Sequence, residues 1–457
     1  MSNPDSQQDA QPLTPLAASK LWFYPGENLP EGEMRITLMG TGWGNVVGPA
    51  QKGPSIFVEL GNENKDTFVF DVGPGCILNY NAMGIPMSRM NRVFISHLHM
   101  DHCSDLPFIY AFGPNLGDRF VPLEIYGPSG PPLLDENGAP TDTTLGIKNM
   151  IEGMKQFTQW HTTSFKTMSK GSEDSYDLEH HVREFDYRKC GGIALNLGKS
   201  GIDHDHVVIK HFPAVHIIDG AVSYRLEWSP KGREDYIVFV YSGDTLPNDF
   251  MLEYGKNADI MIHETAPSIS SVMNGVGVEA SDAFDIVCNS HTPANSLGSI
   301  LAKTKPKLGV TTHSPVDPRS IEELIMGVQE GMNKHLDNDE EKPAYQVGAD
   351  LMVFSLSKDS ETDESTITTR MSALTDRPWP VRIASTDPDI PAPLADQIKK
   401  YRLGLSKSKD DSELDGVNIF EQVNEAPQCA AYFAQEEGET KEEFIAKSII
   451  RYKKDNK

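Results

Sequence analysis

The chain has 457 residues, of which 38% are hydrophobic and 23% charged, and its formal net charge is −25. This hydrophobic content can support a sizeable core, whereas the acidic charge repels phosphate backbones and disfavours a broad nucleic-acid surface without a basic patch. The amino terminus lacks a secretory pattern, no apolar stretch approaches the roughly 20 residues of a membrane helix, and the five cysteines form no CxxC pair. We therefore expect a cytoplasmic protein with no membrane partner and no disulfide framework.

Predicted strands and helices alternate through the middle of the chain. Strand patterns, several with Gly-rich ends, occur at 34–44, 54–60, 66–75, 91–99 and 121–130, and a helix is predicted at 145–165. A second series of predicted strands occupies 206–216, 222–228, 236–245, 258–264, 308–313 and 349–356, with helices at 295–304 and 320–336. Two batches of strands, each followed by helices, predict an α/β sandwich of two similar halves.

Composition divides the chain into three parts. Residues 1–33 are polar and Pro-rich, and we expect a loose or docking arm. Residues 34–357 carry the predicted sandwich. Residues 358–457 are rich in charge and Pro and offer no recognisable chemistry. We interpret this last part as an extension that wraps the core or a partner.

The stretch "VFISHLHMDHCSD" at 93–105 places three histidines and two aspartates directly after an apolar run. In an extended segment, side chains two apart share a face, so His97, His99 and Asp101 are expected to point the same way. His102 then turns in as the chain leaves the strand. Imidazoles combined with carboxylates are the donors that Zn²⁺ and similar ions prefer. A solvated polar loop is the alternative, but this spacing behind a buried strand indicates a metal site.

More ligands are expected at other strand ends, because one strand end cannot complete the coordination of two ions. Asp244 in "VFVYSGDT" and His313 in "LGVTTHSP" each end an apolar run, and His216 in "FPAVHIIDG" precedes a strand. Each of these alone is typical of a cap or a hydrogen-bonded turn. Four such strand ends in one chain favour a shared metal site.

The motifs resemble those of the metallo-β-lactamase superfamily, and within it the tRNase Z-like branch. That branch includes tRNA 3′-processing endonucleases and related arylsulfatase-like and phosphodiesterase-like hydrolases. The resemblance covers residues 34 to about 356 and rests on these stretches: "GTGWG", "FDVGPG", "SHLHMDH", "YGPSG", "VYSGDTLP", "ADIMIHETA", "SHT" at 290–292 and "TTHSP". It implies an αββα sandwich with a two-metal site at one edge of its sheets, followed here by a C-terminal extension.

The resemblance also implies roles for individual residues. The two metal sites correspond to seven side chains: His97, His99 and His216 for the first, Asp101, His102 and His313 for the second, and Asp244 as the bridge. Asp71 corresponds to an acid that supports the ligands, and His263 and Glu264, which begin "HETA", are expected to be structural or supporting. His291 corresponds to the histidine that helps to protonate the leaving oxygen.

The implied cofactors are two divalent metal ions, Zn²⁺ with Mn²⁺ as the alternative. Such a pair can lower the pKa of a shared water towards about 7, and the resulting hydroxide attacks phosphorus, sulfur or a carbonyl carbon. We therefore expect a hydrolase in which Asp101, Asp244 and His291 take part in catalysis, with no redox cofactor.

The chain departs from the tRNase Z-like pattern at an acidic insertion over 131–215, because the long basic arm that grips tRNA in many such endonucleases is not evident. Three hypotheses follow. The missing arm and the acidic charge favour a hydrolase of small-molecule phosphate or sulfate esters. "SHT" and "HETA" favour a tRNA 3′-processing endonuclease. A non-catalytic binding module ranks last because no ligand is missing. The resemblance also allows a homodimer.

Overall fold

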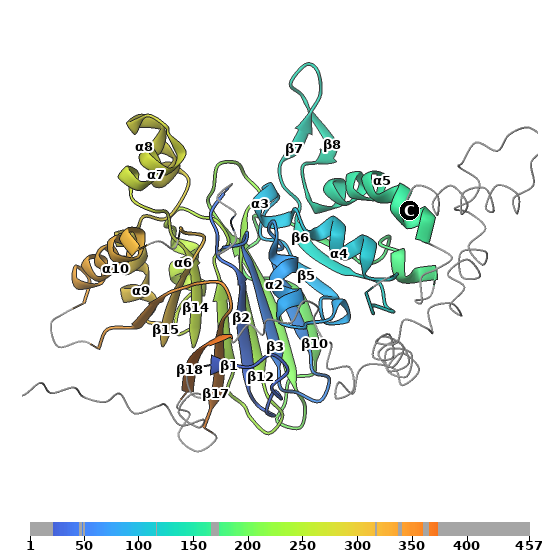
Figure 1. Cartoon of the computed structure of the whole chain (residues 1–457), viewed down its shortest axis with the longest axis horizontal. Coiled ribbons are helices and arrows are strands. Elements are labelled where there is room, and N and C mark those ends of the chain that lie inside the picture. The colour runs from blue at the N-terminus through green and yellow to red at the C-terminus, as the bar shows by residue number, and fades with distance from the viewer. Residues whose placement is uncertain are drawn as a thin grey trace, which may run out of the picture. The chain divides into compact units, whose positions relative to one another are not determined.

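The computed structural model describes residues 22–44, 48, 51–115, 117–165, 173–315, 318–336, 341–359 and 365–372 (Figure 1). All of them lie within one compact unit, Met1–Ile383, and the second unit, Ala384–Lys457, lies outside the described residues. Most of the arm predicted at 1–33 and all of the extension beyond residue 372 therefore stay predictions.

Two large sheets form the frame of the described chain. The first has nine strands in the order β1-β18-β17-β2-β3-β4-β5-β6-β9. In that order their bounds are Trp22–Phe23, Ser365–Ser372, Met352–Lys358, Met34–Gly40, Ser55–Leu60, Thr67–Phe70, Arg92–Phe94, Glu124–Pro128 and Val182–Phe185. The second sheet has seven strands, β10 to β16 in sequence order. Their bounds are Gly192–Gly198, His206–Pro213, Val222–Ser229, Ile237–Tyr241, Ile260–Glu264, Leu308–Thr312 and Ala344–Val347.

Helices cover the outer faces, and two smaller elements project from one end of the sheets. The α-helices are α2 (Cys76–Ala82), α3 (Met100–Cys103), α4 (Leu106–Phe112), α5 (Ile147–Phe165), α6 (Asp249–Tyr254), α7 (Ile269–Val276), α8 (Ala280–Asn289), α9 (Ala294–Thr304) and α10 (Pro318–Asn333). Short 3-10 helices occupy Met87–Arg89 and Glu173–Tyr176. Figure 1 shows the α7–α8 pair and the hairpin of β7 (Pro132–Leu134) and β8 (Pro140–Thr144) at the same end of the sheets. None of the helices in the described part of the chain combines the length and the apolar character needed to cross a membrane.

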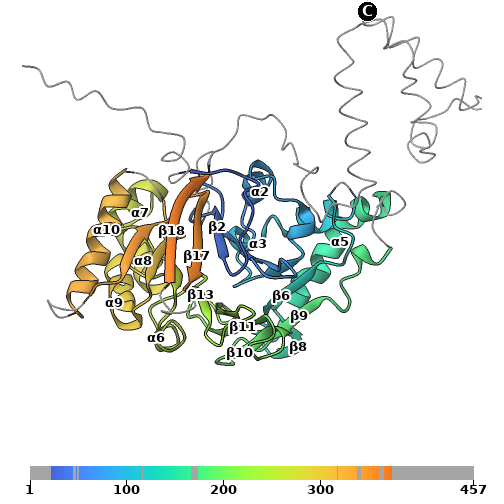
Figure 2. The ribbon, with the colours of Figure 1, turned by 90° about the horizontal axis from the view of Figure 1, so that it is seen from below.

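The main core lies between the two sheets. Phe70 of the first sheet packs against Tyr224 and Phe239 of the second, with ring centroids 5.5 and 5.3 Å apart. On the outer faces, Phe57 belongs to an apolar cluster shared with α2, α4 and α5, and Val240 to one shared with α6, α9 and α10. Figure 2 shows α9 and α10 on one side of the sheets and α5 on the other. The predicted αββα sandwich is therefore confirmed.

The strands predicted from the sequence are present in the core, but several elements at the margins of the fold were not predicted. The first sheet continues past residue 357, because β18 (Ser365–Ser372) pairs antiparallel with β17 along its full length. The run of β-branched residues from Thr366 to Thr369 forms a strand that the charged composition of this region concealed. The α7–α8 pair and the β7–β8 hairpin were likewise not anticipated.

Candidate metal centre

Five carboxyl-terminal strand ends meet at one edge of the molecule. Within the first sheet β4 and β5 are parallel, and within the second β13, β14 and β15 are parallel. Parallel strands place their carboxyl ends at the same edge, where ligands usually bind. Asp71 follows β4, the segment 95–99 follows β5, Asp244 follows β13, Glu264 ends β14 and His313 follows β15. The topology thus gathers polar residues that are far apart in sequence.

Three imidazoles form one donor group, here called the imidazole group: His97, His99 and His216. Nε2 of His97 and Nε2 of His216 lie 3.1 and 3.2 Å from Nδ1 of His99, and all three ligand atoms are within 4.8 Å of one another. His97 is buried, whereas His99 and His216 are partly exposed. The structure brings the predicted first ligand set together across 117 residues of sequence between His99 and His216.

Two carboxylates and two imidazoles form the other donor group, here called the carboxylate group: Asp101, His102, Asp244 and His313. Nε2 of His102 lies 3.2 Å from Oδ1 of Asp244, and Nε2 of His313 lies 3.1 Å from Oδ2 of Asp101. All four ligand atoms are within 4.8 Å of one another. These are the three residues predicted for the second metal together with the predicted bridge.

Asp244 lies between the two groups. Its Oδ2 is 3.4 Å from Nε2 of His313 in the carboxylate group, and 3.8 and 3.9 Å from Nε2 of His97 and His216 in the imidazole group. Burial acts to raise the pKa of Asp244, but the surrounding histidines, His102 foremost, hold it well below its usual range. The carboxylate is therefore ionised and placed where two cations could share it.

The local backbone differs from the extended segment that the sequence predicted. Strand β5 ends at Phe94, and α3 begins at Met100, so Asp101 and His102 lie in the first turn of a helix rather than on one face of a strand. The alternation argument for Asp101 was therefore wrong, although the residue still reaches the site. Helix α3 is fixed in place by its contact with Gly73, where a Cβ would lie 2.1 Å from the carbonyl oxygen of Asp101.

Two non-glycine residues of the site adopt left-handed backbone conformations. Asp71 and His313 each have φ of 57°. A conformation of this kind costs on the order of 1–3 kcal/mol and persists where the surrounding structure imposes it. Gly243, directly before Asp244, also has φ of 57°, and a Cβ there would lie 2.7 Å from the Cβ of Ser96. The strand ends are thus bent sharply to present their side chains.

Asp71 contacts the predicted ligand His102 directly and supports His97 through Ser96. It is fully buried and accepts four hydrogen bonds: from the backbone N–H and the hydroxyl of Ser96 at 2.7 Å each, from Nδ1 of His102 at 2.8 Å and from the Tyr241 hydroxyl at 2.7 Å. Burial acts to lower the pKa of His102, but Asp244 and Asp71 raise it well above its usual value, so the ring is protonated. Its Nδ1 donates to Asp71 and its Nε2 faces Asp244, where a metal ion would take the place of the Nε2 proton.

The same arrangement holds for two residues of the imidazole group. Nδ1 of His216 donates to the main-chain carbonyl of Ser290 at 2.7 Å. Nδ1 of His97 lies 3.1 Å from the Ser96 hydroxyl, whose own proton is donated to Asp71. Both rings therefore carry their proton on Nδ1 and turn a bare Nε2 towards the group. Burial lowers the pKa of His97 well below its usual value, which keeps that ring neutral.

Two buried atoms at the centre support the fit of a metal ion. Nε2 of His102 and Oδ1 of Asp244 are buried and make no hydrogen bond of good geometry. Burying a polar atom without a partner costs free energy, and a divalent cation would give both atoms one. Imidazole nitrogens and carboxylate oxygens are also the donor types that Zn²⁺ accepts. The residues present therefore fit a pair of divalent ions.

Comparison with known proteins agrees with this geometry. Ribonuclease Z from Listeria welshimeri is 28% identical over 240 residues, which cover 50% of this chain and 76% of that enzyme. Ribonuclease Z from Pyrococcus furiosus is 29% identical over 246 residues, covering 52% and 76%. No protein-family model matches the chain. The chain is tRNase Z-like: it is similar in sequence to these ribonuclease Z proteins over about half of its length, and its sandwich has the metallo-β-lactamase fold.

Solved structures of the metallo-β-lactamase fold are also similar to this chain. Human tRNase Z, short form, is 17% identical with a TM-score of 0.43 and covers 70% of this chain and 98% of that chain. The metallo-β-lactamase fold protein YhfI from Bacillus subtilis is 16% identical with a TM-score of 0.44, covering 71% and 99%. Through its similarity to the ribonuclease Z relatives, the tRNase Z-like chain is a metal-dependent hydrolase, and the same similarity implies a dinuclear divalent-metal site.

In this tRNase Z-like site, His291 is buried beside Asp244 and contacts Glu264. Nδ1 of His291 is 3.2 Å from Oε1 of Glu264 and 3.9 Å from Oδ2 of Asp244. The same Oε1 accepts the backbone N–H groups of Thr245 and Thr292. Burial acts to lower the pKa of His291, but the adjacent Glu264 carboxylate raises it to about 9. The ring therefore carries a proton at neutral pH.

His263 is the one predicted site residue that lies apart from the donors. It is fully buried in β14, its Nδ1 donates to the carbonyl of Glu264, and it belongs to none of the donor groups found among the described residues. Neighbouring residues of a strand face opposite ways, so Glu264 faces the site while His263 packs within the sheet.

Three supporting residues escaped the sequence analysis: Ser96, Tyr241 and Ser290. All three stand inside quoted motifs, directly before His97, three residues before Asp244 and directly before His291, but their types carry no signal of their own. Ser290 acts through its main-chain oxygen, which no side-chain pattern could reveal.

Proposed function

We propose that this chain is a tRNA 3′-processing endonuclease of the ribonuclease Z type. The observation that supports this is the convergence of seven donors, Asp244 among them, in a chain whose curated relatives are named ribonuclease Z. These relatives favour an RNA substrate over the small-molecule ester that the sequence analysis ranked first. We propose Zn²⁺ for both ions because five of the seven donors are imidazoles, with Mn²⁺ as the alternative.

The chain's own residues bind, orient and protonate in this mechanism. When bound, two divalent ions supply a water of lowered pKa and neutralise charge on the phosphate. Asp71 and Ser96 hold the ligand rings in one tautomer, so that the donors need no rearrangement. The protonated His291, held by Glu264, lies beside Asp244, where it can donate to the leaving oxygen as the bond between phosphorus and that oxygen breaks.

A small phosphodiester or sulfate ester is the second candidate. The specific observation that favours it is the pocket beside the imidazole group, where none of the lining residues in the described chain is Lys or Arg. Phosphates that flank the scissile bond in RNA would find no cation there. A substrate with a single phosphate or sulfate group needs no further cation in this pocket, so the lack of Lys and Arg there would not weaken its binding.

The test is a comparison of turnover by the Zn²⁺- or Mn²⁺-loaded full chain on four substrates: a precursor tRNA with a 3′ trailer, an aryl phosphodiester, an aryl sulfate and a lactone. The proposal expects cleavage of the precursor tRNA with the largest kcat/KM. Turnover of the aryl phosphodiester or sulfate without cleavage of the tRNA would assign the second candidate. A non-catalytic binding module would turn over none of the four. Light scattering of the same preparation tests the predicted homodimer.

A further inference from the structure

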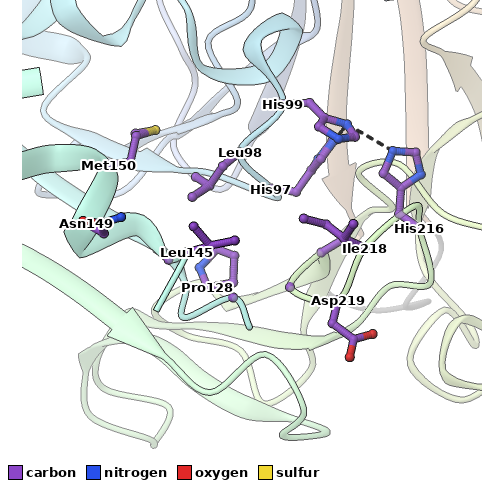
Figure 3. Close-up of a pocket in the computed structure, with 14 residues that line it drawn as sticks. His97, Leu98, His99, Pro128, Leu145, Asn149, Met150, His216, Ile218 and Asp219 are labelled. Carbon is purple, nitrogen blue, oxygen red and sulfur yellow. Dashed lines mark hydrogen bonds between the residues drawn. The ribbon is translucent and has the colours of Figure 1, made fainter. Parts of the chain in front are cut away.

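A pocket beside the imidazole group has walls that the metal chemistry does not use. It encloses about 300 Å³ and opens next to the three histidines. Its apolar walls come from separate segments: Leu98 after β5, Leu145 and Met150 around the start of α5, and Ile218 in the loop before β12. Figure 3 shows these side chains gathered below and beside the imidazole rings.

Close backbone contacts fix this pocket relative to the donors. Gly220 has φ of 122°, and a Cβ there would lie 2.9 Å from Cα of Gly130. Gly130 in turn has φ of 62°, and a Cβ there would lie 2.6 Å from the carbonyl oxygen of Leu145. The loop that carries His216 and Ile218 therefore rests on the turn at Gly130, and that turn packs against Leu145 just before α5. These two backbone contacts fix the apolar wall relative to His216.

The apolar side chains of the pocket walls are exposed to solvent. Ile218 is 56% exposed and Leu145 is 41% exposed, although both adjoin a concave site. Apolar side chains that surround a concavity mark a place where a ligand binds. The polar lining is sparse, and Asp219 accepts a hydrogen bond from the Tyr187 hydroxyl and points away from Leu98 in Figure 3.

We propose that this pocket binds an aromatic ring that the substrate carries next to the phosphate being hydrolysed; in an RNA substrate that ring is a nucleobase. The inference rests on the proposed phosphodiester hydrolysis, because it places the phosphate at the donor groups. The ring packs against Leu98, Leu145 and Ile218, and no cation in the described lining selects for a second phosphate instead. Burial of one ring accounts for about a tenfold gain in affinity.

Equilibrium binding of phenyl phosphate and methyl phosphate to the Zn²⁺-loaded full chain tests this directly. We expect phenyl phosphate to bind about tenfold more tightly, and the ratio of the two affinities to fall to about twofold in Ile218→Ser and in Leu145→Ser. Both side chains are partly exposed, so neither change should unfold the chain. Ile193→Ser is the matched control, because Ile193 is 59% exposed on β10 and does not line the pocket. Equal affinities in the unmodified chain, or an unchanged ratio in both pocket variants, would overturn the proposal.

Two further measurements separate this inference from the proposed function and identify the ring. Turnover of bis(4-nitrophenyl) phosphate without any preference for phenyl phosphate overturns the pocket alone. A preference for phenyl phosphate without turnover of any phosphodiester supports the pocket and overturns the function. Adenosine 5′-monophosphate that binds at least as tightly as phenyl phosphate assigns the ring to a nucleobase, and weaker binding assigns it to a smaller aryl group.

Discussion

The imidazole group and the carboxylate group adjoin each other but differ in charge and burial. The imidazole group has three neutral ligands, two of them partly exposed, and it borders the apolar pocket. The carboxylate group has two anionic ligands, and its His102, Asp244 and His313 side chains are each 3% exposed or less. An ion at the carboxylate group would have its charge reduced by Asp101 as well as by the shared Asp244, whereas an ion at the imidazole group would have only Asp244 nearby. We therefore expect an anionic substrate to be drawn to the group that borders the pocket.

The largest expected effect comes from removing the residue that the two groups share. Asp244→Ala should lower kcat/KM by about 10³-fold or more, because both groups lose a donor and the histidines around it lose their counter-charge. His99→Ala should have a comparable effect through the imidazole group alone. Kinetics and metal content should be measured together. Asp203→Ala, at an exposed aspartate outside the site, is the control, and full activity in either site variant would contradict the assignment.

The next effect separates chemistry from metal binding. His291→Ala should slow cleavage of RNA by about 10²-fold or more without releasing metal, because the leaving oxygen loses its proton donor. A 4-nitrophenyl diester should be affected far less, since its leaving group needs no proton. His291 also lies within ligand distance of His216 and Asp244. Loss of metal from this variant would therefore show that it is a ligand rather than an acid.

A smaller effect should distinguish the two groups. Asp71→Asn should weaken metal binding by about 10- to 100-fold, because the aspartate orients ligands through its hydrogen bonds. Asp71 accepts a hydrogen bond directly from His102, whereas it contacts the imidazole group only through Ser96, whose hydroxyl lies beside His97. One of the two ions should therefore be lost first in a chelator titration. Equal loss of both ions would show that the groups do not differ in this support. Circular dichroism should check that the sheets remain intact.

The smallest effect concerns a histidine outside both groups. His211 is buried against Phe185, and burial together with Lys189 lowers its pKa to about 4. As pH falls from about 6.5 towards 4, the unfolded chain binds a proton that the folded chain does not, so the free energy of unfolding falls by about 1–3 kcal/mol.

His211→Phe should flatten this part of the pH dependence, since Nδ1 of His211 has no hydrogen-bond partner to lose. Denaturant unfolding between pH 4 and 7 measures the effect. His204→Gln, at an exposed histidine, should leave the slope as it is. An unchanged slope in His211→Phe would show that His211 is charged in the folded chain at low pH.

The sequence predicts the strands and the metal-donor residues of this molecule better than it predicts the backbone conformation around those residues. Apolar runs identified β13, β14 and β15 because parallel buried strands leave few polar positions. The donors were identifiable because histidines and aspartates at strand ends have few structural reasons to cluster. The turn of helix at Met100 could not be predicted, because it is imposed by packing against Gly73 rather than by local propensity.

The remaining failures also have physical causes. Residues that act through the main chain, such as Ser290, leave no trace in side-chain chemistry. The strand at Ser365–Ser372, which lies between β17 and the short edge strand β1, has one polar face and lies beside charged sequence, so its composition matched an extension. Substrate identity depends on which walls surround the metals, and Leu145 and Ile218 meet only in the folded chain.

The carbonyl oxygen of Ser290 has a consequence for the end of the molecule that carries α7 and α8. Helix α8 ends at Asn289, and the next residue offers the acceptor that sets the ring plane of His216, while the residue after that is His291. A shift of α8 would therefore move the side chains of both His216 and His291. A molecule that binds the α7–α8 pair could in this way slow turnover without entering the pocket.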